Sequence, residues 1–266
     1  MYSHVVFSIA IVALVSPCHG YMKLYKVTNL IEDNFPICRT GLRQSPIDLN
    51  NEAQILHTYY LPFEFENYDR LTSVSVIIGK DGHTVNSTSK WENEDLAVSA
   101  SETIPRYKFL DLHLHWARSH EPGTEHAFYG RRYDAELHLV HINSAYKDFE
   151  EALQYEDGFL VLGALLKTIP KHRANHLISI SASEDDYGVF NINFNKFNEI
   201  SAVFSYSGSL TTPPCTENVL WVVPRHPFEV SPLTIKALRR LSKDSNSSNV
   251  RSLQKLNDRE VYLFTI

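Results

Sequence analysis

Positive charge is scarce in this chain. Lys and Arg number 25 against 31 Asp and Glu, which gives a formal net charge of −6 at pH 7. No run of basic residues provides a face that could bind phosphate groups. We therefore expect no nucleic acid among the partners of this protein.

Long apolar runs are absent after the first twenty residues, so we expect no membrane anchor. The opening segment, MYSHVVFSIAIVALVSPCHG, contains no Lys, Arg, Asp or Glu. Its apolar part, residues 5–15, has the length of a signal-peptide core and is too short to cross a bilayer. A buried N-terminal helix is the alternative interpretation. We predict a signal peptide over 1–20, a mature domain over 21–266, and a secreted, extracellular protein.

Cysteine is rare, and its distribution fits secretion. The chain has three cysteines, of which Cys18 leaves with the predicted signal peptide. In an oxidising compartment Cys38 and Cys215 are expected to form one disulfide, although two free thiols remain the alternative. Closing so long a loop would stabilise the fold by about 5 kcal/mol in the chain-entropy description.

Two Asn-X-Ser/Thr sequons also fit a secreted chain. They begin at Asn86, in Asn86-Ser87-Thr88, and at Asn246, in Asn246-Ser247-Ser248. A sequon is used only where its backbone is accessible. We expect Asn246, in a polar stretch, to be glycosylated more readily than Asn86.

Internal repeats and low-complexity linkers are lacking, which indicates one domain. Short runs rich in β-branched and aromatic residues dominate, and turn signals such as Glu121-Pro122-Gly123 separate them. The predicted strands cover 71–78, 108–116, 135–142, 159–166, 220–223 and 261–266. Helical patterns occur only over 147–156 and 232–241. We predict a β-dominated α+β domain on a large central twisted sheet, mixed but mostly antiparallel, with short peripheral helices.

The predicted strand over 108–116 has an unusual polar face. Asp111, His113 and His115 occupy alternate positions, with leucines and a tryptophan between them. Side chains at alternate positions of a strand point the same way. About twenty residues on, AELHLVH places Glu136 and His138 on one face in the same manner. If the two strands pair, three imidazoles converge; a solvated polar face is the alternative.

Three imidazoles suit Zn²⁺ and leave a fourth tetrahedral position for water. A structural zinc site would be closed by a fourth protein ligand, usually a cysteine, and neither remaining cysteine belongs to a metal-type pair. The pattern therefore predicts an open, catalytic zinc site. Asp111 and Glu136 each precede a histidine by two residues, where a carboxylate can accept the second ring proton and fix the tautomer.

The chain resembles the α-class carbonic anhydrases of the secreted type over nearly all of 35–266. The resemblance rests on stretches that occur in the order and with the spacing of that family. They are QSPID (44–48), GHTVN (82–86), LHLHW (112–116), EH (125–126), AELHLVH (135–141), DGFLVLG (157–163), SLTTPP (209–214) and NVRSLQ (249–254).

The resemblance implies a role for each matching residue. His113, His115 and His138 are the implied zinc ligands, with Glu136 behind His138. Thr211 is the threonine that accepts a hydrogen bond from zinc hydroxide and donates its own proton to the buried Glu125. Further implied residues are the proton shuttle His83, the disulfide pair Cys38 and Cys215, the product-anion contact Thr212, and the carbon dioxide pocket of Val140, Val161, Leu210, Val219 and Trp221.

The implied activity is the reversible hydration of carbon dioxide to bicarbonate and a proton, by attack of zinc-bound hydroxide. The expected partner is this small substrate alone, and the expected state is a monomer. One alternative is a catalytically silent relative that serves as a secreted binding module, although such proteins typically lose zinc ligands that are present here. A zinc hydrolase acting on esters is another, but no HExxH helix motif supports it.

One site residue departs from the family pattern. Asp111 occupies a position where members commonly have Gln. A carboxylate accepts a hydrogen bond more strongly and adds negative charge near the metal. We therefore expect Asp111 to tighten zinc binding and to raise the pKa of the metal-bound water modestly.

Overall fold

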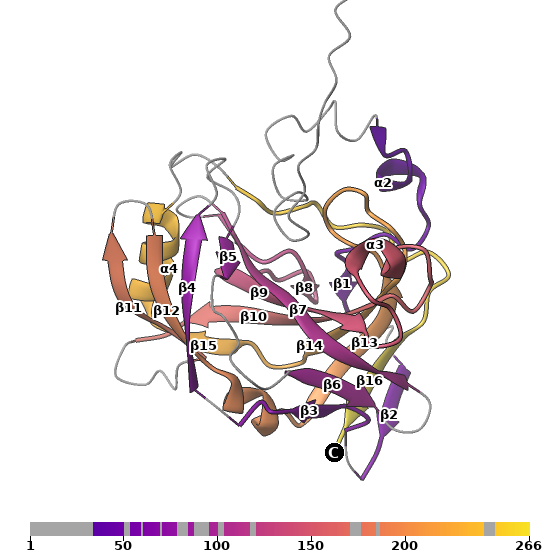
Figure 1. Ribbon diagram of the computed structural model, residues 1–266, viewed down its shortest axis with the longest axis horizontal. Helices are drawn as coiled ribbons and strands as arrows, with labels where there is room; N and C mark the ends of the chain where they lie inside the picture. Colours follow the sequence, from indigo (N-terminus) through magenta and orange to yellow (C-terminus); the bar gives the residue numbers. More distant parts are fainter. Residues whose placement is uncertain are drawn as a thin grey trace, which may run out of the picture.

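The fold is organised around one strongly curled sheet that runs through the middle of the molecule (Figure 1). The computed structural model describes residues 34–50, 54–59, 61–69, 71–78, 85–87, 96–100, 104–117, 121–170, 177–184, 187–241 and 248–266. Among these residues no helix combines the length and apolar character needed to cross a membrane. The predicted signal peptide and Asn246 lie outside the described residues.

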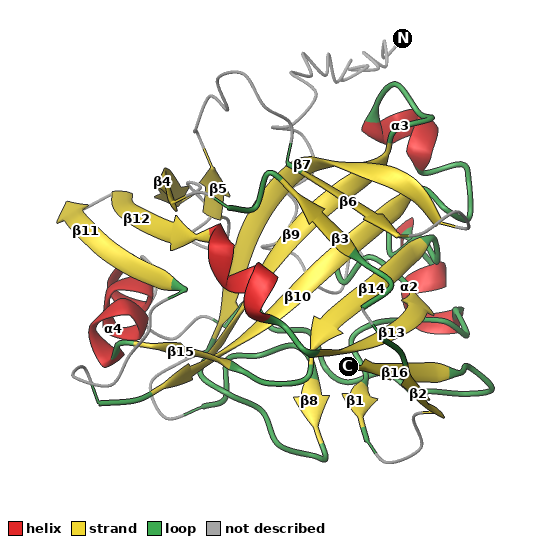
Figure 2. Cartoon of the chain, turned by 90° about the horizontal axis from the view of Figure 1, so that it is seen from below, coloured by secondary structure: helices red, strands yellow, loops and turns green. Residues whose placement is uncertain are grey.

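The central sheet is mixed, mostly antiparallel, and confirms the predicted architecture (Figure 2). Its strands follow one another in space in the order β2 (Gln54–His57), β16 (Val261–Thr265), β13 (Ala202–Gly208), β14 (Val219–Pro224), β10 (Phe159–Thr168), β9 (Ala135–Asn143), β7 (Ile104–Trp116), β6 (Ala97–Ala100) and β3 (Glu64–Glu66), and β15 (Phe228–Val230) pairs with β10.

Smaller elements surround this sheet. A four-stranded sheet contains β11 (Ile178–Glu184), β12 (Tyr187–Asn193), β4 (Leu71–Ile78) and β5 (Val85–Ser87), and a short parallel pair is formed by β1 (Asp48–Leu49) and β8 (Ala127–Phe128). The helical segments are α2 (Ile37–Thr40), α3 (Phe149–Ala152), the 3₁₀ helix η3 (Phe194–Glu199) and α4 (Pro232–Leu241).

The helix predicted over 147–156 is much shorter than expected. It begins after Asp148, whose carboxylate accepts a hydrogen bond from the Glu151 N–H, and α3 ends at Ala152. The chain then turns back so closely that a Cβ on Gly158 would overlap the Ala152 carbonyl oxygen. Because Phe159 must already enter β10, there is no room for the further helical turn that was predicted over 153–156.

Strands β7 and β9 pair antiparallel in the register that the sequence pattern required. His113 is the cross-strand partner of His138, and His115 is the partner of Glu136. A β-bulge interrupts the register, since Phe109 pairs with His141 but Asp111 pairs with Val140. After this bulge, Asp111, His113 and His115 share the face of the sheet that carries His138.

The two faces of the central sheet bury different sets of side chains. One face packs Leu112, Leu114 and Leu137 into the larger apolar cluster, which also contains Leu160 and Phe194. The opposite face, which carries the histidines, packs a second cluster that includes Val140, Val161, Phe204, Tyr206 and Trp221. Along β7 the leucines therefore face the apolar core, and the histidines between them face the candidate metal site.

A disulfide ties the N-terminal side of the described chain to the loop after β13. Cys38 and Cys215 are joined with Cα atoms 5.2 Å apart, across a sequence separation of 177 residues. The prediction of this pair is confirmed. Nearby, the Ser45–Pro46 and Pro213–Pro214 peptide bonds are cis.

Candidate metal centre

Three imidazole rings meet on one face of the β7–β9 pair. The ring centroids of His113 and His115 are 5.2 Å apart, those of His113 and His138 are 5.1 Å apart, and those of His115 and His138 are 4.5 Å apart. One nitrogen from each ring lies within 4.8 Å of the other two. The convergence expected from the sequence is therefore present in the fold.

In each ring, the nitrogen that faces away from the other two histidines donates its proton to an acceptor. The other ring nitrogen therefore keeps its lone pair. The Nδ1–H of His115 donates to the carbonyl oxygen of Asn249 at 2.8 Å, and the Nε2–H of His138 donates to Glu136 Oε1 at 2.8 Å. Nδ1 of His113 lies 3.4 Å from Asp111 Oδ2. The lone pairs are thus left on Nε2 of His113, Nε2 of His115 and Nδ1 of His138, which all face inward.

The distance between two of these nitrogens matches that expected around a tetrahedral zinc ion. Two nitrogens bound tetrahedrally at about 2.0–2.1 Å from Zn²⁺ must lie about 3.3–3.4 Å apart. Nε2 of His113 and Nδ1 of His138 are 3.3 Å apart. Nε2 of His115 is buried and has no hydrogen-bond partner in the described part of the protein. A cation between the rings would satisfy all three nitrogens.

Burial favours the neutral form of His115 and His138, which is the form that metal ligation requires. Desolvation lowers the pKa of His138 well below its ordinary value, and the neighbouring His115 adds to this, against the opposing effect of Glu136. Desolvation also lowers the pKa of His115. A neutral imidazole has a lone pair to donate, whereas an imidazolium has none.

Glu136 serves two histidines, of which the sequence analysis assigned only one. Its Oε1 accepts from Nε2–H of His138 and, at 2.7 Å, from Nδ1–H of His126, while its Oε2 accepts the backbone N–H groups of Glu125 and His126 at 2.8 and 2.9 Å. Burial opposes ionisation, but His126 and His138 hold the pKa of the Glu136 carboxyl well below its ordinary value. The residue is therefore an ionised, fully occupied acceptor.

His126 also contacts the core behind the site through its second ring nitrogen. Its Nε2 lies 2.7 Å from the Tyr206 hydroxyl, which donates to Ser45 Oγ at 2.9 Å. His126, Glu136 and His138 also cluster closely enough to suggest a second metal site. In this cluster the ring N–H groups of His126 and His138 both donate to Glu136 Oε1. The three side chains therefore form a hydrogen-bonded network. The EH pair at 125–126 was the available sequence signal for it.

The acceptor for His115 was also missed from the sequence. The Asn249 carbonyl oxygen belongs to the main chain, and its segment lies 134 positions away in sequence. The Asn249 side chain holds that segment against β7, because its Oδ1 accepts the Trp116 N–H at 2.7 Å and its Nδ2 donates to the Leu114 carbonyl at 2.9 Å. A backbone carbonyl acceptor cannot be recognised from the sequence, because residues of every type have one.

The hydrogen bond expected between Thr211 and Glu125 is not formed in this structure. Glu125 is 1% exposed, and its Oε1 accepts the backbone N–H of Arg251 at 2.8 Å. Its Oε2 has no hydrogen-bond partner among the described residues and lies 3.5 Å from Nε2 of His115. Thr211 is buried in the loop after β13. A free acceptor oxygen is nevertheless present beside the histidines.

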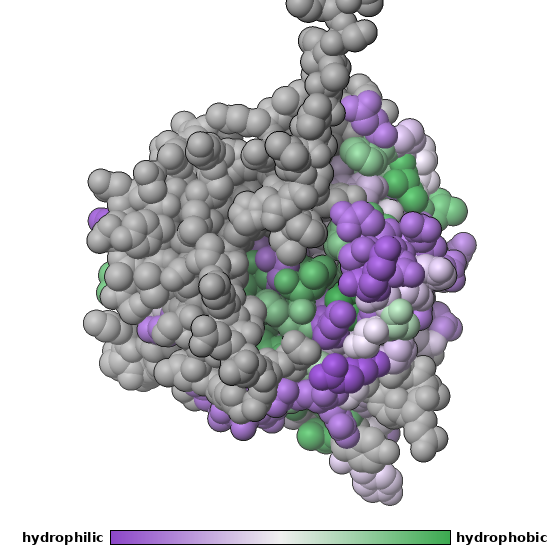
Figure 3. All heavy atoms as spheres, in the orientation of Figure 1, coloured by the Kyte–Doolittle hydropathy of each residue, from purple (hydrophilic) through white to green (hydrophobic). Residues whose placement is uncertain are grey.

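Apolar side chains form the wall next to the three rings. Val140 pairs with Val161 across β9 and β10, and Val161 pairs with Trp221 across β10 and β14. The Trp221 ring lies 4.9 Å from the His138 ring, centroid to centroid. Val219 is buried as well, and the predicted pocket residues Leu210 and Thr212 are half-buried. Figure 3 shows a hollow over the sheet with an apolar floor.

The roles predicted for His83 and Asn86 stay predictions. His83 lies outside the described residues, so its predicted role as proton shuttle stays a prediction. Asn86 belongs to β5, which pairs with β4, but its side chain is not described. The predicted glycosylation of Asn86 therefore stays open as well.

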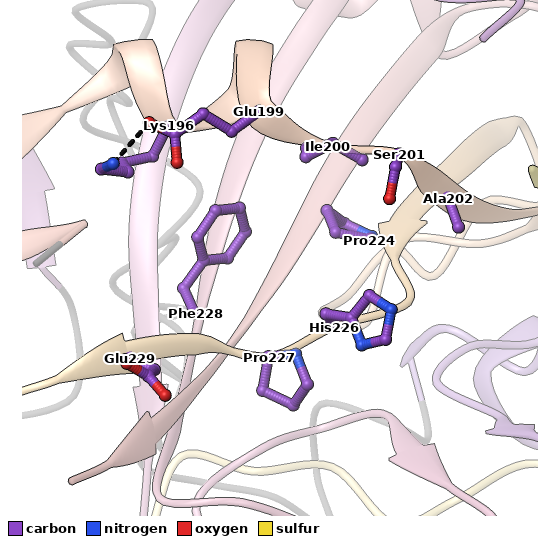
Figure 4. A pocket seen from close by; sticks show the side chains of 10 residues that line it. All are labelled: Lys196, Glu199, Ile200, Ser201, Ala202, Pro224, His226, Pro227, Phe228 and Glu229. Atoms are coloured by element: carbon purple, nitrogen blue, oxygen red, sulfur yellow. Dashed lines mark hydrogen bonds and ion pairs between the residues drawn. The ribbon is translucent and has the colours of Figure 1, made fainter. Parts of the chain in front are cut away.

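A separate pocket of about 220 Å³ lies between η3 and β15 (Figure 4). Phe228 forms part of its wall, and Lys196 pairs with Glu199 at its edge. Among the described residues, no residue of the three-histidine centre lines this pocket. It is not the predicted site.

The fold and the three facing imidazoles define a β-sheet protein with a candidate metal centre made of histidines. The profile of the eukaryotic-type carbonic anhydrase family matches residues 29–265. Carbonic anhydrase 12 of Homo sapiens is 32% identical over 246 residues, which cover 86% of this chain and 68% of that protein. Carbonic anhydrase 7 of Mus musculus is 30% identical over 214 residues, covering 78% and 80% respectively.

The chain belongs to the eukaryotic-type carbonic anhydrase family. Members of this family are zinc-dependent carbonate dehydratases, which are lyases. The family assignment made from the sequence motifs is therefore confirmed.

Proposed function

We propose that this protein is a secreted zinc carbonic anhydrase that interconverts carbon dioxide and bicarbonate. The proposal rests on one observation above all: three imidazoles face one another, with one nitrogen of each ring within 4.8 Å of the other two and with two of these nitrogens 3.3 Å apart, the spacing expected around a tetrahedral zinc ion. His113, His115 and His138 would hold the ion. A bound Zn²⁺ would supply a nucleophile at neutral pH by lowering the pKa of its water to about 7, as it does in carbonic anhydrases generally.

The residues of this chain would prepare that chemistry. Asp111, Glu136 and the Asn249 carbonyl orient the three rings. The apolar side chains of Val140, Val161 and Trp221 exclude water from the neighbouring space, which suits a non-polar substrate. In the family pattern, Glu125 and Thr211 orient the attacking oxygen, and His83 carries the released proton to solvent.

Secretion belongs to the same proposal. The Cys38–Cys215 disulfide fits an oxidising compartment, and the segment 1–20 would direct the chain there. In this proposal residues 21–266 form one monomeric mature domain, and Asn246 is its preferred glycosylation site. Mass spectrometry of the protein from culture medium would identify the mature N-terminus and the occupied sequon.

Stopped-flow hydration of carbon dioxide tests the activity. We expect rapid hydration by the zinc-loaded protein, loss of activity with a chelator, and recovery on adding Zn²⁺. His138→Ala should remove activity and zinc binding together, because it removes one of three ligands. His226→Ala, at an exposed histidine in the separate pocket, is the matched control and should behave as the unmodified protein. A zinc-loaded protein without hydration activity would instead favour the silent binding module.

A further inference from the structure

The buried carboxylate of Glu125 depends on a distant segment for its orientation. Its only hydrogen bond from the described residues to a carboxylate oxygen comes from the backbone N–H of Arg251 at 2.8 Å. Its Oε2, 3.5 Å from His115 Nε2, has no hydrogen-bond partner in the same part of the chain. Whatever fixes the Arg251 main chain therefore fixes where Oε2 points.

Two arginine side chains fix that main chain. The Nη2 of Arg132 donates to the carbonyl oxygen of Glu125 at 3.1 Å and to that of Arg251 at 3.3 Å. The guanidinium of Arg251 donates to the carbonyl oxygens of Ser45 and Cys38, each at 2.7 Å. Arg132 thus joins the two segments whose contact creates the bond to Glu125, and Arg251 anchors its own segment to the disulfide-bearing region.

The same segment also holds a metal ligand. Residues 249–251, which we call the strap, begin with the Asn249 carbonyl that accepts from His115 and end with the Arg251 N–H that donates to Glu125. Both groups belong to the main chain, so a shift of the strap would move the partner of His115 and the partner of Glu125 together.

We propose that Arg132 and Arg251 are positioning residues that orient the Glu125 carboxylate through the strap. Neither guanidinium needs to touch substrate. Each acts by holding main-chain groups, and the orientation of Glu125 Oε2 is the result. This inference rests on the proposed function, because Glu125 has a catalytic consequence only in a working enzyme.

A double-mutant cycle tests the inference. Arg132→Met keeps an unbranched apolar stem but removes the guanidinium donors, and we expect kcat for carbon dioxide hydration to fall about tenfold with little change in KM. Arg132→Lys keeps a charged donor and should restore kcat to within about threefold of the unmodified protein. Arg131→Gln is the control, because the exposed Arg131 packs on the Tyr133 ring and reaches neither carbonyl.

The cycle is completed with Glu125→Gln. If Arg132 acts through Glu125, Arg132→Met should lower kcat little further when Glu125→Gln is already present. Independent, multiplicative losses would overturn the inference, and so would an unchanged kcat in Arg132→Met. Should Arg132→Met not fold, Arg251→Lys enters the same cycle, since it keeps the N–H to Glu125 but weakens the anchor to Ser45 and Cys38.

Amide hydrogen exchange gives a readout independent of turnover. The Arg251 amide should exchange about tenfold faster in Arg132→Met than in Arg131→Gln, because local opening of the strap becomes easier. Equal exchange in the two variants would count against the inference. An unmodified protein that binds zinc but lacks activity would contradict the proposed function, while the exchange result would still decide the role of Arg132.

Discussion

Nε2 of His138 lies 2.8 Å from Oε1 of Glu136, and both groups are buried. The ring is therefore oriented by an ionised acceptor that it shares with His126. Loss of such partners typically lowers metal affinity 10–100-fold. Glu136→Gln, which keeps the shape but not the charge, should weaken zinc binding about tenfold in a chelator competition assay. Glu150→Gln on the surface of α3 is the control, and a Glu136→Gln affinity within twofold of it would contradict this account.

Asp111 should raise the pH at which activity appears. Its Oδ2 lies 3.4 Å from Nδ1 of His113, and its side chain is 34% exposed, so its charge acts on the site through partial screening. Asp111→Gln should shift the midpoint of the pH–rate profile downward by a fraction of one pH unit and weaken zinc binding slightly. Stopped-flow rates across neutral pH measure the shift. An unchanged or higher midpoint would refute the role assigned to this carboxylate.

His141 should make the metal-free protein less stable in acid. Burial lowers its pKa to about 4 from 6.5, and its Nε2 lies 2.7 Å from the Tyr68 hydroxyl. As the pH falls below 6.5, the unfolded chain binds a proton that folded His141 does not. The free energy of unfolding should therefore decrease by about 3 kcal/mol from this residue between pH 6.5 and pH 4.

His141→Gln isolates this contribution, because its amide can still reach the Tyr68 hydroxyl. Urea denaturation at several pH values should show the variant losing less stability in acid than the unmodified protein. Parallel stability curves for the two proteins would mean that His141 does not titrate as described.

Gly208 should be intolerant of a side chain. A Cβ there would overlap Ser45 Oγ and lie 2.8 Å from atoms of both Tyr206 and Trp221. Because overpacking a buried site costs about 1–3 kcal/mol, Gly208→Ala should lower the free energy of unfolding by that amount in urea denaturation. Ser207→Ala, at the exposed neighbouring position, should change stability little. Equal stability of the two variants would show that the Ser45 region can move aside.

The metal-binding face of the site could be predicted from the sequence, because it follows from the alternation of side chains along a strand. His113, His115 and His138 alternate with leucines, so both the strands and their shared face follow from the pattern, and the β7–β9 register agrees. The Asn249 carbonyl could not be predicted in this way, because every residue has a carbonyl and only the fold decides which one meets His115.

Long-range packing also set the limits of the secondary-structure prediction. The helix predicted over 147–156 has a suitable apolar spacing, but the return of the chain into β10 ends it at Ala152. The Thr211–Glu125 hydrogen bond was implied by resemblance alone. The structure instead gives Glu125 a partner from the Arg251 main chain, which no local pattern indicates.

The β-bulge in β7 divides that strand into two independently registered halves. Before the bulge Phe109 pairs with His141, and after it Asp111 pairs with Val140. Because the bulge takes up one extra residue of β7, the pairing before it does not dictate the register of His113 and His115 with β9. The alignment of His113 with His138 is thereby set by the part of the strand after the bulge, and the residues before it keep a separate pairing with β9.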